Sequence, residues 1–154
     1  MPFYINTRNE NSHKEIARLL EKCIRRNKKD WSEIVFLCIG SDRVTGDCLG
    51  PYVGYRLSQY QLPGISVYGT LNQPVHAVNL EHMTEFITLH HPAALVIAVD
   101  ASLGEKEHLG YVTIGNGSLY PGAAVQKELP PVGDIYITGI VNISGILEYL
   151  TLQT

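Results

Sequence analysis

Residues 39–51 read IGSDRVTGDCLGP and join a short apolar run to a segment with helical spacing. The three glycines of this stretch allow the backbone to turn tightly or to come close to a ligand. Asp42 and Asp47 lie where the loop between a strand and a helix of an α/β fold displays its side chains. We therefore expect the function of the chain to centre on Asp47.

Short apolar runs alternate with helical patterns along the rest of the chain. The strand patterns lie at residues 33–39, 65–68, 94–99, 111–114 and 135–141, and the helical patterns at 12–29, 51–62 and 80–90, with a final helix starting near residue 144. Apolar runs without polar alternation are typical of strands that are buried on both faces. The order of the elements predicts a three-layer α/β/α domain with a largely parallel sheet.

The N-terminal segment has the pattern of an amphipathic helix. Ser12 and Glu15 have the spacing of a capping box, and apolar residues then recur at intervals of three and four up to Ile24. Eight of the 12 Lys and Arg residues lie between Arg8 and Lys29, which favours a solvated helix face, and those of the last turn, from Arg25 on, suit the negative end of the helix dipole. A basic surface for nucleic acid is the alternative interpretation of this cluster.

Length and composition indicate one domain, because 154 residues with 45% hydrophobic content suffice for a single core. We expect residues 1–30 to pack on this domain as a helix and residues 31–154 to form the α/β domain itself, with a truncated C-terminal helix. No apolar run approaches the roughly 18–20 residues that span a bilayer, and the N-terminus lacks a signal-peptide core. We therefore expect a soluble, cytoplasmic protein with no membrane partner.

A second aspartate, Asp100, follows the buried run at residues 94–99. Ligands of open α/β sheets usually bind beyond the carboxyl ends of the strands, and both Asp47 and Asp100 are predicted at that edge. If their strands are neighbours, one carboxyl group holds a proton while the other accepts one, as needed to polarise a carbonyl group and activate water. The alternative is structural, with Asp47 capping the following helix and Asp100 capping a turn.

Nucleotide and metal binding are two further interpretations. The glycine-rich loop has neither the ending of a P-loop nor the G-x-G-x-x-G pattern, and Asp47 would repel a phosphate, so we predict no nucleotide. Two carboxylates and a histidine could ligate a metal ion, the candidates being Asp47, Asp100 and one of His76, His82 and His108. No histidine pair has a ligand spacing within one helix, and the three cysteines have no zinc or disulfide spacing. We predict no cofactor and no metal.

Several separate motifs resemble, in order, those of the YyaC-type sporulation proteins of spore-forming Firmicutes. They are residues 40–51 (GSDRVTGDCLGP), 68–71 (YGTL), 74–77 (PVHA), 100–104 (DASLG), 121–123 (PGA) and 137–142 (ITGIVN), and the resemblance extends from residue 33 to 153. That family is related to the spore germination protease and, more distantly, to the hydrogenase maturation endopeptidases.

The resemblance implies an α/β/α fold of the phosphorylase/hydrolase-like type and an endopeptidase activity. The germination protease is thought to use one aspartate in a Thr-x-Asp-x-Leu-Gly-Pro loop and one after a strand that ends in Asp-Ala; these positions are Asp47 and Asp100 here. We assign substrate binding to Asp42, Thr45, His76 and Gly104. The expected partner is a peptide or protein, such as the small acid-soluble spore proteins, in the forespore or mother cell, and an oligomer is compatible with the sequence.

Two alternatives to this function stay open. One is a non-catalytic sporulation protein that holds a peptide in the same cleft. The other is a metal-binding protein like the hydrogenase maturation endopeptidases, in which equivalent acidic positions and a later histidine bind nickel. The chain has no histidine after Asp100 other than His108, so we expect no nickel.

Overall fold

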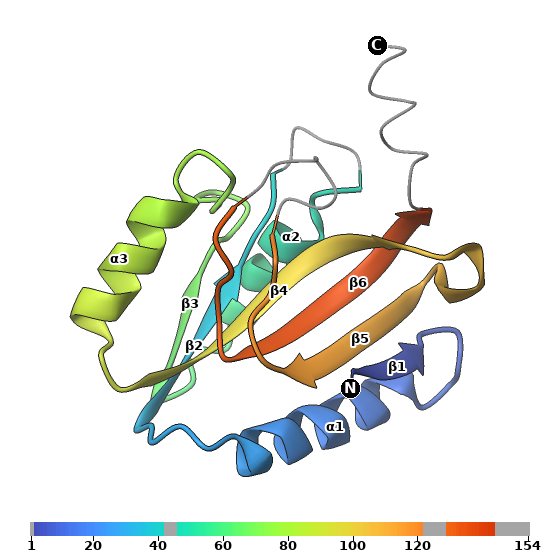
Figure 1. Cartoon of the computed structure of the whole chain (residues 1–154), viewed down its shortest axis with the longest axis horizontal. Helices are drawn as coiled ribbons and strands as arrows, with labels where there is room; N and C mark the ends of the chain where they lie inside the picture. Colours follow the sequence, from blue (N-terminus) through green and yellow to red (C-terminus); the bar gives the residue numbers. More distant parts are fainter. Residues whose placement is uncertain (1, 42–45, 122–128, 144–154) are drawn as a thin grey trace.

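The computed structural model describes residues 2–41, 46–121 and 129–143. The helices are α1 (Ser12–Arg26), α2 (Leu49–Ser58) and α3 (Leu80–His90), with a 3-10 turn η1 (Lys106–His108). The strands are β1 (Phe3–Asn6), β2 (Glu33–Cys38), β3 (Ile65–Tyr68), β4 (Ala94–Gly104), β5 (Tyr111–Asn116) and β6 (Ile135–Ile143). The strands form one sheet in the order β1-β5-β6-β4-β2-β3 (Figure 1). β3, β2, β4 and β6 pair in parallel, while β5 and β1 add antiparallel pairs at one edge.

Apolar side chains project from both faces of the sheet. Helices cover each face (Figure 1). On one face, α1 contributes Leu19 and Cys23 to a cluster with Leu95, Ile97, Ile114 and Ile135, and Leu57 of α2 lines a cavity with Phe36. On the other face, α3 contributes Leu80 and Ile87 to a cluster with Val35, Leu37 and Ala98. The three-layer α/β/α architecture and the largely parallel sheet predicted from the sequence are therefore confirmed.

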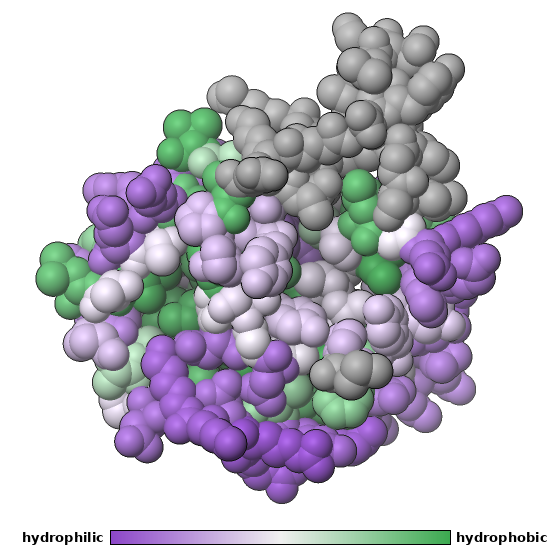
Figure 2. Space-filling view, viewed as in Figure 1, coloured by the Kyte–Doolittle hydropathy of each residue, from purple (hydrophilic) through white to green (hydrophobic). Residues whose placement is uncertain are grey.

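The exposed side of α1 is strongly hydrophilic, as Figure 2 shows along the lower edge of the molecule. The helix was correctly located by its apolar spacing, but the predicted capping box is wrong. The helix begins at Ser12, its N-cap is Asn11, and no side chain caps it. The Ser12 hydroxyl instead donates a hydrogen bond to the backbone oxygen of Thr7 at 3.4 Å. No helix among the described residues is long and apolar enough to cross a membrane.

The strand that carries Asp100 is longer than the apolar run at residues 94–99. β4 continues to Gly104 because β6 pairs with it over the whole distance, with Asp100 opposite Thr138 and Gly104 opposite Ile143. Asp100 therefore lies inside the strand and does not follow it, so the structural alternative of a turn cap is wrong for this residue.

Two further elements differ from the sequence prediction. Strand β1 was not predicted, since its four residues pair only with β5 at the edge of the sheet. Helix α2 begins at Leu49, two residues before the predicted start at Pro51. The final helix predicted from residue 144 lies outside the described residues.

Helix α2 packs unusually close to the ends of the strands, and glycines make this possible. A Cβ atom on Gly50 would lie 2.0 Å from the backbone oxygen of Ile39, and one on Gly54 would lie 1.9 Å from that of Gly69. Real Cβ contacts of this length do not occur, so only glycine allows the backbones to approach so closely. The start of α2 is thereby fixed against the carboxyl end of β2.

Gly54→Ala should destabilise the protein, although alanine is favoured over glycine in a helix interior by about 1 kcal/mol. Overpacking against the Gly69 carbonyl should lower the free energy of unfolding by about 2 kcal/mol or more, measured by urea denaturation. Arg56→Ala, at an exposed position of the same helix, is the control and should change stability by less than about 0.5 kcal/mol. Equal stability of the Gly54 variant and the wild type would contradict the close contact.

Candidate active site

Asp47 ends the loop between β2 and α2. Its backbone oxygen accepts a hydrogen bond from the Ser41 N–H at 2.9 Å, which closes the loop onto the end of β2. Gly46, with φ of 89°, supplies the left-handed backbone conformation just before it. A Cβ atom on Gly40 would lie 2.2 Å from the Asp47 backbone oxygen, so Asp47 rests directly against this glycine. The Asp47 residue is only 9% exposed.

The structure does not support helix capping by Asp47. The N-cap of α2 is Cys48, and its side chain makes no capping hydrogen bond. The backbone hydrogen bond that acts on the Asp47 carboxyl group comes from Ser41, in the loop before it. The position of Asp47 is therefore not explained by a role as the N-cap of α2.

Asp100 lies in the middle of the sheet, because β4 is flanked by β2 and β6. It is 5% exposed, and its carboxyl group accepts a backbone hydrogen bond from Ala101. Along β4 it follows Ala98 by two residues and therefore points to the face that α3 covers. The two aspartates lie close enough for the negative charge of Asp47 to raise the pKa of Asp100, in agreement with their predicted proximity.

Asp47, Asp100 and His76 line one small cavity. The other lining residues are Ile39, Gly40, Ala77 and Leu129. The cavity has a volume of about 20 Å³, which is room for about one water molecule. The fold thus brings together, around a single water-sized space, three of the residues that the sequence singled out.

The two carboxyl groups have pKa values that are raised to different extents. Burial raises the pKa of Asp47 to about 6, against the opposing effect of the Ser41 hydrogen bond. Burial and, to a lesser extent, the negative charge of Asp47 raise the pKa of Asp100 to about 8, against the opposing effect of the Ala101 hydrogen bond. Asp47 therefore ionises first, and Asp100 keeps its proton longer. Between about pH 6 and about pH 8, the two carboxyl groups therefore hold one proton between them.

His76 is held by the turn that starts α3. Its backbone N–H donates to Oδ1 of Asn79 at 2.8 Å, and its ring Nδ1 accepts the N–H of Val78 at 3.3 Å. A neutral ring whose Nδ1 accepts a hydrogen bond carries its proton on Nε2. His76 can therefore offer a hydrogen-bond donor to a ligand of the cavity.

The remaining predicted residues lie elsewhere. Gly104 lines a second, larger groove and not the small cavity, while Asp42 and Thr45 are outside the described residues. Among the residues that the structure describes, no group of three or more His, Cys, Asp and Glu side chains is arranged to hold a metal ion.

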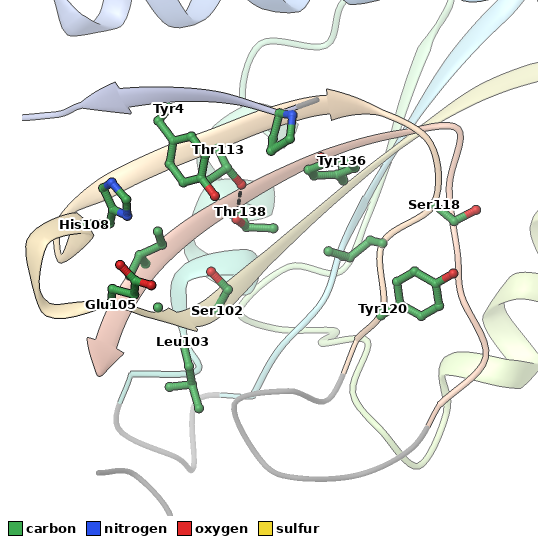
Figure 3. Close-up of a pocket in the computed structure, with 14 residues that line it drawn as sticks. Tyr4, Ser102, Leu103, Glu105, His108, Thr113, Ser118, Tyr120, Tyr136 and Thr138 are labelled. Atoms are coloured by element: carbon green, nitrogen blue, oxygen red, sulfur yellow. Dashed lines mark hydrogen bonds between the residues drawn. The ribbon is translucent and has the colours of Figure 1, made fainter. Parts of the chain in front are cut away.

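The larger groove, with a volume of about 530 Å³, contains residues that sequence reasoning missed (Figure 3). It is lined by Pro2, Tyr4, Ser102, Leu103, Gly104, Glu105, His108, Thr113, Ser118, Leu119, Tyr120, Tyr136, Thr138 and Ile140. Thr113 and Thr138 form a buried hydrogen-bonded pair across β5 and β6. These two threonines, each between isoleucine and other apolar or small residues, are the signal in the sequence that could have pointed to this groove.

The fold and the site define a class: a three-layer α/β protein with two buried carboxyl groups and a histidine around a cavity at the carboxyl end of its parallel strands. Residues 4–154 match the model of the family described as Protein of unknown function (DUF1256). The chain belongs to this family. It is 49% identical over 150 residues to the Uncharacterized protein YyaC of Bacillus subtilis (strain 168), and the match covers 97% of this chain and 72% of that relative.

The raised pKa values predict a particular dependence of stability on pH. Between the unfolded pKa near 4 and the folded values of about 6 and about 8, the folded protein holds protons that the unfolded chain releases. The free energy of unfolding should therefore fall by several kcal/mol as the pH rises from about 4 to about 8, since each unit of pKa corresponds to about 1.4 kcal/mol. Urea denaturation at a series of pH values measures this slope.

Asp100→Asn should remove most of the slope, because asparagine does not titrate and avoids a buried charge at high pH. Asp30→Asn, at an exposed position, is the matched control and should keep the wild-type slope. A wild-type stability that stays constant or rises over this pH range would show that the two carboxyl groups are not buried as described.

Proposed function

We propose that this protein hydrolyses peptide bonds and that Asp47 and Asp100 activate the attacking water. The observation that carries the proposal is the water-sized cavity lined by two buried carboxyl groups with different pKa values. Pairs of carboxyl groups whose environments separate their pKa values are the usual arrangement for combined acid and base catalysis. At neutral pH one group can accept a proton while the other can donate one.

In the proposed mechanism, the Asp47 carboxylate removes a proton from water while the water oxygen attacks the peptide carbonyl carbon. Protonated Asp100 gives its proton to the carbonyl oxygen, so a tetrahedral diol forms. Asp47 then delivers its proton to the leaving nitrogen as the C–N bond breaks, and one diol hydroxyl returns a proton to Asp100. The products are a carboxylic acid and an amine, and both aspartates regain their starting states.

The choice of a peptide as substrate is supported by the expected relation of the YyaC-type proteins to the germination protease, whose proposed catalytic aspartates correspond to Asp47 and Asp100. It is also supported by the groove that contains Thr138, the neighbour of Asp100 on β6, since a groove of about 530 Å³ accommodates a ligand with several side chains. Small acid-soluble spore proteins are the first substrates to test. A role in sporulation is part of this proposal.

Cleavage of a small acid-soluble spore protein should require both aspartates. We expect Asp47→Asn and Asp100→Asn each to reduce kcat by at least about 100-fold, the usual contribution of a positioned acid or base, measured by separating the products over time. Asp30→Asn should keep the wild-type rate. Equal cleavage by the wild type and the two active-site variants would remove the assignment.

The pH profile tests the division of labour in the pair. Activity should be greatest near about pH 7, because Asp47 loses its function as a base below about pH 6 and Asp100 loses its function as an acid above about pH 8. The measurement is kcat/KM as a function of pH at a temperature where the protein stays folded throughout. A rate that rises steadily up to about pH 10 would exclude a protonated Asp100 from the reaction.

Peptide binding without catalysis is the second candidate function. It is favoured by the burial of Asp47 and Asp100, which at 9% and 5% exposure leave little surface for a peptide carbonyl group to reach. On this alternative, a peptide occupies the larger groove without being cleaved. Binding that survives both asparagine substitutions, with no products from the wild type, would favour this function over hydrolysis.

A further inference from the structure

The larger groove is lined by Thr138 of β6, which is paired with Asp100 of β4, and it crosses the sheet from there. A row of four paired residues crosses the sheet on the face to which Asp100 points. Asp100 of β4 is paired with Thr138 of β6, Thr138 with Thr113 of β5, and Thr113 with Tyr4 of β1. This row spans three strand spacings, roughly 14 Å at about 4.8 Å each. A ligand bound at Asp100 can therefore extend along the row towards the edge of the sheet.

Aromatic rings form a wall of the groove, and other residues hold them in place. Tyr4 is 50% exposed and stacks on His108 with ring centroids 4.8 Å apart, while His108 in turn contacts Tyr111 at 5.1 Å. Tyr136 packs over Gly115, where a Cβ atom would lie 2.4 Å from its hydroxyl oxygen. Rings that are fixed before a ligand arrives lose little conformational entropy when it binds.

The charge of the groove is negative and comes from one residue. Glu105 is the only Asp, Glu, Lys or Arg among the lining residues. It is exposed, and it makes no ion pair with the residues that the structure describes. Figure 3 shows Glu105 and His108 at one end of the groove, near Tyr4, and Ser118 and Tyr120 at the other. A carboxylate that forms no ion pair with a described residue, at the same end of the groove as a half-exposed tyrosine ring, is suited to a cation.

We propose that the groove holds the polypeptide substrate and that Glu105 and the Tyr4 ring bind a lysine or arginine side chain of it. This inference rests on the proposed function, because it assumes that the peptide bound in the groove is the substrate whose scissile bond lies at Asp47 and Asp100. The basic residue lies about four residues from that bond, since an extended chain covers about 3.3 Å per residue. Recognition of a cation at this distance makes Glu105 a specificity residue.

The test is a binding titration followed by nuclear magnetic resonance. The probes are capped octapeptides of Ala, Gly and Ser that carry a single Lys, norleucine or Glu, with that residue moved through successive positions. Lysine peptides should bind about fivefold or more tightly than norleucine peptides and should shift the resonances of Tyr4 and of β5. Glutamate peptides should bind most weakly, because Glu105 repels them.

Glu105→Gln should abolish the preference for lysine over norleucine, and Tyr4→Leu should reduce it. The matched control is Glu107→Gln, which changes an exposed glutamate of η1 that does not line the groove, and it should keep the full preference. No binding of lysine peptides, or a lysine preference that persists in Glu105→Gln, would overturn the proposal.

The same peptides separate this inference from the proposed hydrolysis. Cleavage of spore proteins without a lysine preference in binding would overturn the assignment of the groove and leave the aspartate pair intact. A lysine preference that Glu105→Gln removes, with no cleavage of any substrate, would support the groove as a peptide site and overturn hydrolysis.

Discussion

The close contact between α2 and the ends of β2 and β3 is the constraint on which the site depends. Gly50 lies against Ile39, Gly54 against Gly69, and a Cβ atom on Gly69 would lie 1.8 Å from the Cys38 oxygen. These are contacts between backbones, so the helix start cannot move without losing them. The loop before the helix must then return to the end of β2, and this return carries Asp47 towards the neighbouring strand β4, which holds Asp100.

The burial of two carboxyl groups works against stability at neutral pH. A buried ionised carboxylate such as Asp47 and a buried polar group such as protonated Asp100 both cost free energy, which apolar residues of similar size would avoid. The apolar clusters on both faces of the sheet offset it, because they surround the site with well-packed strands. A fold that keeps such a pair around a water-sized cavity is consistent with a chemical role for it.

The two faces of the sheet are covered unequally by helices. Within the part of the chain that the structure describes, α1 and α2 share one face, while α3 is the one helix that packs on the other, over β2, β3 and β4. Because side chains alternate along a strand, β5 and β6 give isoleucines to the first face and threonines to the second. Residues of intermediate hydropathy are visible in the middle of the second face in Figure 2. The same alternation thus builds both the core and the groove.

The sequence alone determined where the three helices and the parallel strands lie and that Asp47 and Asp100 stand at the same edge of the sheet, while the pairing of β2 with β4 that brings the two aspartates together came from the structure. These features depend on local patterns: apolar spacing, glycines next to a strand end, and the rule that parallel strands end at one edge. It did not determine strand β1, the extension of β4 past Asp100, or the groove from Thr138 to Tyr4. Those depend on which strands become neighbours, and Thr113 and Thr138 are 25 residues apart in the chain. Only the tertiary structure fixes such a register, because each pairing is stabilised by segments whose contact no local pattern records.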